Sequence, residues 1–327
     1  MTTPPMICRL PACKRRMHGF TLLEWVIAMP LGLLIVMAAT AIYLAGIRLW
    51  RVQAERYEVN ERAAFALNQL TRAVGMAGYR NWDPLEGPIL NADRSVQPGL
   101  GDWPSLRASA ECASTVDTCP KRGWQGSTML EVQYHGAGFG DESSNGNGAI
   151  QNCGGASVRA RSDGDDRNVS AFYVDKGEDG VPSLFCRYGD RGYKITTLRP
   201  AQVLVIGVEA MYIRLGVRAG ANGNGPLQWM TPVKSARRKP PSAPAGSGGW
   251  ENVSAVAFSL VLRGAPRRGG KQHAGRTVEV FDATSGGREY KWLTNAGDVH
   301  LHVFTVVAYR RNDGGIREEA KWLVSSS

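Results

Sequence analysis

The sequence is poor in histidine and lacks the short motifs of common enzyme classes. Its 327 residues include five scattered histidines, and no GxSxG, HExxH, Walker or dinucleotide-binding Rossmann pattern is present. His300 and His302 would share one face of a strand, a spacing that can bind a metal ion but more often arises by chance. We therefore expect no enzymatic activity and no cofactor.

The six cysteines do not form the CxxC pairs that are common in zinc sites. Two of them lie in the basic N-terminal segment, and an even set remains after it: Cys112, Cys119, Cys153 and Cys186. Four cysteines allow three disulfide pairings. The sequence favours Cys112 with Cys119 in a short loop and Cys153 with Cys186 in a longer one, with a zinc site as the rival interpretation.

Acidic residues are absent from the first 19 positions, which contain four Lys or Arg residues. Charged side chains are also absent from Trp25–Ile47, an apolar run of 23 residues. A helix through this run would rise about 34 Å, enough to cross a bilayer. Because basic residues beside a span stay cytoplasmic, the chain after Ile47 should be extracytoplasmic, in agreement with disulfide formation.

One carboxylate, Glu24, stands at the entrance of the apolar run, in the stretch Gly19-Phe20-Thr21-Leu22-Leu23-Glu24. A charged side chain in hydrocarbon costs about 2.5–3.5 kcal/mol on insertion scales, so such a residue is expected to be functional and to have a partner. If the chain were cut after Gly19, Phe20 would carry a positive terminus. That terminus could pair with Glu24 of the same chain or of a neighbour.

These residues resemble the class III signal of type IV pilins and type II secretion pseudopilins. In that family a prepilin peptidase cuts after the glycine and methylates the new N-terminal residue, the positions that Gly19 and Phe20 match. The resemblance implies that Glu24 guides docking into a growing filament by neutralising the terminus of the preceding subunit. An ordinary secretory signal cleaved after Ala41 and an uncleaved membrane anchor are the alternatives.

The pattern and the resemblance together predict an α+β fold. A long N-terminal transmembrane and stalk helix would pack on an antiparallel β-sheet head with long irregular loops. We expect a leader at residues 1–19, a transmembrane or filament-core helix at 20–47, its amphipathic continuation at 48–78 and an extracytoplasmic β-rich head at 79–327.

The helix should run from Phe20 to about Ala77, a length of about 87 Å. Gly75 and Gly78 mark its expected end. Pro30, with Gly32, should bend or loosen the helix, and it departs from the unbroken helix of the family. The apolar stripe of the second half is formed by Val52, Val59, Ala63, Ala66, Leu70 and Ala73.

Beyond Tyr79 the sequence changes to short runs of β-branched and aromatic residues, which predict an antiparallel sheet. The expected strands are Ser127–Tyr134, Val169–Asp175, Ser183–Tyr188, Tyr193–Leu198, Gln202–Val217, Val253–Arg263, Arg276–Phe281 and Val299–Arg310. Four segments rich in Gly, Pro, Ser and Asn are expected to be loops inserted in one head: Gly136–Gly148, Ala219–Pro226, Ala236–Gly249 and Gly264–Gly275.

Three segments of the head, Leu204–Val217, Val253–Arg263 and His302–Arg310, resemble the PilW type of minor pilin. This resemblance implies a subunit that joins other minor pilins and the major pilin, primes pilus assembly on the inner-membrane assembly platform and ends at the tip, with a tip adhesin as a candidate partner. The pilus could serve twitching motility, cell adhesion or DNA uptake. The alternatives are a J-type minor pseudopilin of type II secretion and a membrane-anchored extracytoplasmic binding protein or enzyme.

Acidic clusters in turns raise a calcium hypothesis, because clustered carboxylates can supply oxygen ligands. The candidates are Asp163, Asp165, Asp175 and Asp179, but neither cluster has the EF-hand spacing and turn chemistry explains both, so we expect no metal site. Of the 39 Lys and Arg residues, four lie in the leader, so 35 remain against 29 Asp and Glu and the mature net charge is +6. Spread over the chain, this mild excess does not favour nucleic-acid binding.

Overall fold

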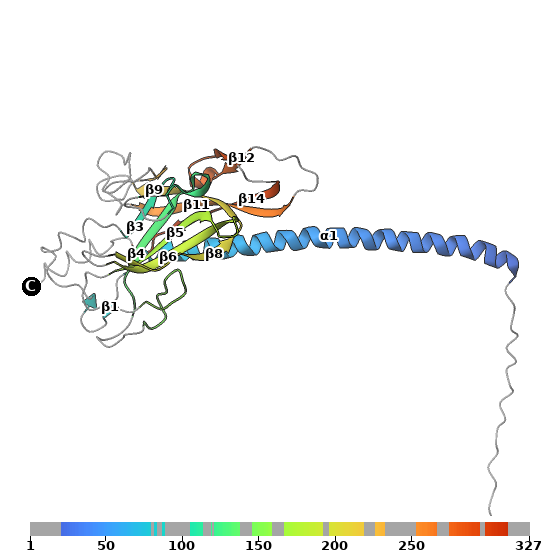
Figure 1. Ribbon diagram of the computed structural model, residues 1–327, viewed down its shortest axis with the longest axis horizontal. Coiled ribbons are helices and arrows are strands. Elements are labelled where there is room, and N and C mark those ends of the chain that lie inside the picture. The colour runs from blue at the N-terminus through green and yellow to red at the C-terminus, as the bar shows by residue number, and fades with distance from the viewer. Residues whose placement is uncertain are drawn as a thin grey trace, which may run out of the picture. The chain divides into compact units, whose positions relative to one another are not determined.

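The structure is a computed structural model that describes residues 21–79, 82–83, 87–88, 105–113, 119, 121–137, 146–158, 167–191, 196–218, 226–232, 253–266, 275–294 and 298–312. The chain divides into two compact units, Met1–Ala54 and Glu55–Ser327. One long apolar helix and antiparallel sheets make an α+β fold, as the sequence predicts. Figure 1 shows these elements.

The helix α1 (Leu22–Met76) has 55 residues and continues through Pro30 and Gly32 without a break. Its start and end lie within two residues of the expected ones, and Gly78, with φ 77°, takes the left-handed conformation common just after a helix. By length and composition α1 can cross a membrane, and no residue of its most apolar window is buried.

A first antiparallel sheet has the strand order β3-β4-β5-β6-β7, with β8 paired to β6 as well. Its strands are β3 (Leu106–Ser109), β4 (Met129–Tyr134), β5 (Arg167–Lys176), β6 (Pro182–Arg191), β7 (Thr196–Leu198) and β8 (Gln202–Ile206). The 3-10 turn η2 (Trp124–Gly126) precedes β4.

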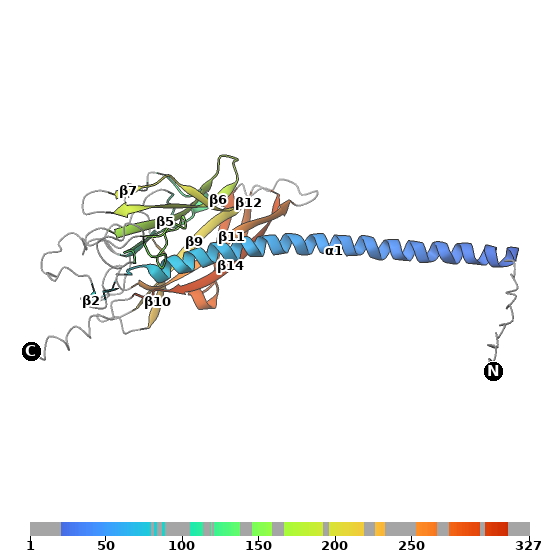
Figure 2. The same ribbon diagram turned by 90° about the horizontal axis from the view of Figure 1, so that it is seen from below.

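A second antiparallel sheet has the order β10-β9-β11-β14. Its strands are β9 (Val208–Arg218), β10 (Leu227–Met230), β11 (Val253–Pro266) and β14 (Val299–Tyr309). Two further strand pairs are β1 (Trp82–Asp83) with β2 (Gly87–Pro88), and the hairpin of β12 (Gly275–Val280) and β13 (Glu289–Thr294), whose connection contains the 3-10 turn η4 (Ala283–Ser285). Figure 2 shows both main sheets from the side of α1.

The main core of the second unit is shared by both sheets and the last part of α1. The helix contributes Val59, Ala63, Ala66, Leu70, Ala73 and Val74, which are buried. They confirm the predicted apolar stripe except for Val52, which is 47% exposed and belongs to the first unit. This stripe meets the sheets because i, i+3, i+4 and i+7 positions lie on one face of a helix.

Strand β11 is buried along its first ten residues on both faces. Phe258 and Leu260 point into the main core, whereas Ala257 and Val261 belong to a second core under the β12–β13 hairpin. Successive side chains of a strand point to opposite faces, so a strand covered on both sides reads as a continuous apolar run.

Several strand predictions need correction. The expected strand Gln202–Val217 is divided at Gly207, which has φ 83°, into β8 and β9, and these belong to different sheets. The strands β1, β2, β3, β10 and β13 were not predicted from the sequence. Most residues of the four expected loops lie outside the described part of the chain.

Candidate functional site

The start of α1 is held by a reciprocal contact between Thr21 and Glu24. The Thr21 amide and hydroxyl donate to Glu24 Oε2 at 2.8 and 3.0 Å, and the Glu24 amide donates to the Thr21 hydroxyl at 3.4 Å. A Thr-x-x-Glu sequence at this place is a capping box, which satisfies amides that have no partner within the helix. The expected cleavage and methylation positions, Gly19 and Phe20, lie outside the described residues.

The first unit presents apolar side chains to its surroundings along the whole expected span. Leu22, Trp25, Ile35 and Ile42 are examples, and each is more than half exposed. Exposed apolar surface of this extent marks a segment that lipid or other helices must cover. The described part of the first unit is therefore a helix that can anchor in lipid or pack against other helices. Glu24 is an acidic side chain near its start.

In the second unit, Arg62 ties α1 to the point where the two sheets meet. Its guanidinium donates to the Ile206 carbonyl at 3.3 Å and to the Arg263 carbonyl at 3.2 Å. Arg62 also pairs with Glu58, one turn earlier in α1, at 3.7 Å. A side chain at Gly207 would come within 2.7 Å of the Arg62 guanidinium, so the approach requires glycine there.

The structure pairs Cys112 with Cys119 and Cys153 with Cys186, the pairing that the sequence favours. The Cα atoms lie 5.4 Å and 6.1 Å apart, within the usual range for a disulfide. Cys112 and Cys186 are fully buried. The second bridge joins the segment before β5 to the middle of β6.

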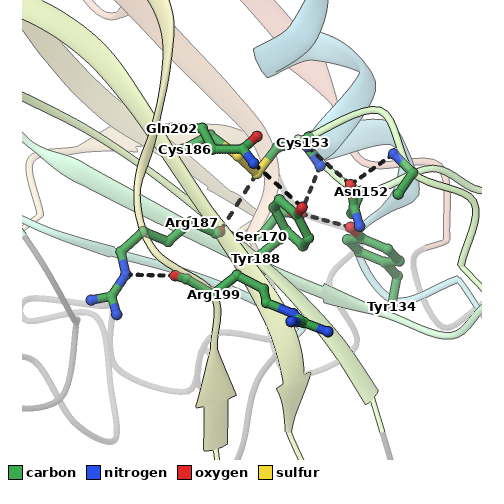
Figure 3. The surroundings of a disulfide bond; sticks show 11 residues. Tyr134, Asn152, Cys153, Ser170, Cys186, Arg187, Tyr188, Arg199 and Gln202 are labelled. Carbon is green, nitrogen blue, oxygen red and sulfur yellow. Dashed lines mark hydrogen bonds between the residues drawn. A yellow bond between two sulfur atoms is a disulfide. The ribbon is translucent and has the colours of Figure 1, made fainter.

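Hydrogen bonds fix the segment that carries Cys153, as Figure 3 shows. Ser170 Oγ accepts the Cys153 amide at 3.2 Å and pairs with the Tyr134 hydroxyl at 2.6 Å. The Asn152 side chain accepts the amides of Gly154 and Ala156 at 3.0 and 3.1 Å. Burial raises the pKa of the Tyr134 hydroxyl, so it stays protonated at neutral pH.

A groove of about 330 Å³ lies beside this disulfide. Its walls come from α1, from the segment 151–155 and from β8, with Ser170 and Phe172 of β5 also lining it. The polar lining consists mainly of amides, and Arg72 is the one charged side chain among the lining residues. Such a lining can hold a ligand by hydrogen bonds, but it offers no nucleophile with a neighbouring base.

The acidic residues considered for calcium have other partners where the structure describes them. Asp175 pairs with Lys121 and accepts the Lys176 amide at 2.9 Å. Asp179 accepts the Val181 amide at 2.9 Å within the β5–β6 turn. Asp163 and Asp165 lie outside the described residues, and the described ones contain no group of three or more His, Cys, Asp or Glu suited to a metal ion.

Two buried ion pairs were not predicted from the sequence. Arg107 and Glu131, directly opposite each other on β3 and β4, pair at 2.6 Å. Glu209, fully buried on β9, pairs with Arg263 of β11 and accepts the Trp124 indole N–H at 3.1 Å. In the sequence, only a charged residue inside each apolar run could have indicated these ion pairs. A charge that is buried needs a partner.

Comparison with known protein families gives a match to part of the chain. A family model described as Type IV Pilus-assembly protein W matches residues 171–312, a stretch that begins in β5 and ends after β14. It contains the three segments on which the sequence resemblance rests. No curated protein and no solved structure matched the chain.

Proposed function

We infer that the chain is a type IV pilus-related protein of the PilW type. The observation that carries this inference is the family match over residues 171–312. The long apolar helix at the N-terminal end of the described chain fits a membrane-anchored pilus protein. The two observations concern different parts of the sequence, and both fit a membrane-anchored pilus protein.

Within that system the proposed role is that of a minor pilin. The protein is inserted in the inner membrane with its head in the periplasm, is cut between Gly19 and Phe20, and helps to prime pilus assembly with other minor pilins. The head of more than 200 residues supports a position at the tip, because a bulky head packs poorly in a repeating shaft. The amide-rich lining of the groove beside Cys153 supports a binding role for the head.

The test of this proposal is the mass of the N-terminal peptide of the protein recovered from membranes, with and without active prepilin peptidase. We expect a peptide that begins at methylated Phe20 and is lost without the peptidase. An N-terminus after Ala41, or an uncut chain in both samples, would contradict the proposal. It would favour a secreted or membrane-anchored binding protein instead.

A J-type minor pseudopilin of a type II secretion system is the second candidate, because it shares the cleavage motif. The description of the matching family favours the pilus. Recovery of the processed protein in sheared surface fibres distinguishes the two, since a pseudopilus stays in the periplasm. Processed protein found only in the periplasm would support the pseudopilin.

A further inference from the structure

The β12–β13 hairpin covers the face of the second sheet that points away from the main core. Its inward side chains, Val278, Val280 and Leu293, are buried against Ala257 and Val261 of β11. In Figure 1, β12 lies on the other side of the second sheet from the part of α1 that follows Glu55. The opposite face of the hairpin packs against neither core.

This outer face carries two large aromatic side chains. Tyr290 and Trp292 alternate with the inward residues of β13, and each is 61% exposed. Across the hairpin they face Glu279 and Thr277. The two residues are two positions apart on one strand, so their Cα atoms are about 6.6 Å apart along the strand direction.

The Trp292 ring lies flat on the hairpin. A Cβ atom placed on Gly275 would meet three atoms of the indole within 2.7 Å, so the ring occupies the space above this glycine. One face of the indole therefore contacts backbone while the other is open to solvent. An aromatic ring over a strand glycine stabilises a hairpin, which explains the inner contact but not the solvent-facing Tyr290 beside it.

Polar side chains around the rings are held in place. Glu279 accepts a hydrogen bond from the Tyr290 hydroxyl at 3.3 Å and pairs with Arg288 at 3.1 Å. A carboxylate, a phenol and a guanidinium thus lie next to the exposed aromatic faces, and Thr277 adds a hydroxyl on the opposite strand. These groups can donate and accept hydrogen bonds.

Residues 275–294, the hairpin with its connection, carry three cationic side chains, Arg276, Arg288 and Lys291, and three acidic ones, Glu279, Asp282 and Glu289. Arg288 pairs with Glu279, and Arg276 lies 3.8 Å from Asp298. Glu289 forms ion pairs with two cationic side chains, Arg214 at 2.9 Å and Lys291. A strand of DNA or RNA needs a cationic track beside the stacking rings. The hairpin is neutral over residues 275–294, all of which the structure describes, so it fits an uncharged ligand better.

The size of the face also limits the ligand. Two six-residue strands are about 20 Å long and lie about 4.8 Å apart, which gives an area of a few hundred Å². A stable protein–protein interface covers about 800 Å² on each partner. The described face therefore suits a narrow chain better than a folded domain or a second copy of this protein.

We propose that the outer face of the β12–β13 hairpin binds a neutral saccharide chain. The weakly positive C–H faces of sugar rings stack on the negative faces of Trp292 and Tyr290. Glu279 and Thr277 accept and donate hydrogen bonds to the sugar hydroxyls at the rim of the stack. This proposal does not depend on the pilus assignment, because it concerns the head alone.

The test is binding of the full-length protein, in a zwitterionic detergent without sugar headgroups, to an array of neutral oligosaccharides that includes maltohexaose and chitohexaose. We expect the wild type to bind at least one of them. Trp292→Ala and Tyr290→Ala should each weaken that binding about tenfold or more, whereas Trp292→Phe should retain part of it.

Tyr309→Ala is the matched control, because Tyr309 is 62% exposed but lies on β14 and not on the hairpin. It should bind like the wild type. Thermal unfolding of every variant checks that the hairpin is intact. Absence of binding to all neutral saccharides, or binding that Trp292→Ala leaves unchanged, would overturn the proposal. Trp292-dependent binding of oligo-dT or of a proline-rich peptide, without saccharide binding, would overturn it too.

Discussion

The side chain of Glu24 has a local role in addition to the one proposed for it in the filament. It completes a capping box with Thr21 at the start of α1. A glutamine at the same position can also complete a capping box, but it carries no charge. The two roles can therefore be separated by one conservative substitution.

We expect Glu24→Gln to be cleaved after Gly19 but not incorporated into fibres. The reason is that docking depends on charge while the peptidase chiefly reads the glycine. The measurement is the N-terminal peptide mass together with the amount of protein in sheared fibres. Glu61→Gln, an exposed carboxylate further along α1, is the control. Normal incorporation of Glu24→Gln would show that capping, and not charge pairing, is what assembly needs.

His302 on β14 is a site where pH should act on stability. Burial lowers the pKa of its imidazole, and the nearby His300 and Arg56 lower it further. The unfolded chain, with a histidine pKa of about 6.5, then binds the proton more tightly than the folded one. The contribution of His302 is therefore complete above about pH 6.5 and is lost as the pH falls below that value.

We expect the melting temperature of the wild type to fall between pH 7.5 and pH 5.5, and that of His302→Gln to fall less. Scanning calorimetry of the full-length protein at the two pH values measures the difference. The range stays above the ordinary pKa of carboxylates, about 4, so their protonation contributes little. Equal falls in both proteins would show that His302 does not titrate in this way.

Among the elements, the junction of β8 and β9 depends on Gly207. This residue has φ 83°, its amide donates to the Pro182 carbonyl at 2.9 Å, and Arg62 of α1 lies directly above it. The junction moves the chain from the first sheet to the second. It therefore combines a left-handed backbone with close approach of a charged side chain.

We expect Gly207→Ala to lower the free energy of unfolding by more than the about 1–2 kcal/mol that a left-handed alanine costs, because the methyl group also displaces Arg62 from its two carbonyls. Gly155→Ala is the matched control, since Gly155 has the same φ of 83° and nothing within 4 Å of its Cβ position. Urea unfolding measures both variants. Equal losses would mean that the Arg62 contact contributes nothing.

The long elements could be predicted from the sequence, and the short ones could not. The helix α1 and the strand β11 have uninterrupted apolar patterns over many residues, so their bounds were close. β3 and β10 have four residues each, too few for a pattern. β13 alternates, but its outer positions hold Tyr290 and Trp292, which hide the alternation because they are apolar on the solvent side.

The site was predictable only where chemistry is local in sequence. The favoured cysteine pairs could be inferred from their spacing, and the structure contains both. The Arg62 contacts join residues 144 and 201 positions apart, and the Glu209–Arg263 pair joins two strands through a buried contact. Such contacts depend on the packing of two sheets, which no local pattern specifies.

At the scale of the whole molecule, the second unit should be able to fold without the first. Residues 55–327 retain every buried side chain of α1, from Val59 to Val74. A chain that begins at residue 79 lacks all of them and leaves the main core uncovered. Domains are stable by only about 5–15 kcal/mol, so this loss should prevent folding.

We expect residues 55–327, produced in an oxidising compartment, to unfold cooperatively and to resist limited proteolysis. Residues 79–327 should do neither. Thermal unfolding and a protease time course test both fragments under the same conditions. A stable fragment 79–327 would show that the helix is attached to a head that is complete by itself.

The burial of α1 in the main core also has a mechanical consequence. The part of α1 in the second unit is buried in that core, so tension applied to this part reaches the head through packed side chains. To pull the helix out, a load must slide the whole stripe from Val59 to Val74 at once and release the Arg62 contacts with the β8–β9 junction. We therefore expect the contact between the helix and the head to resist such a load in shear.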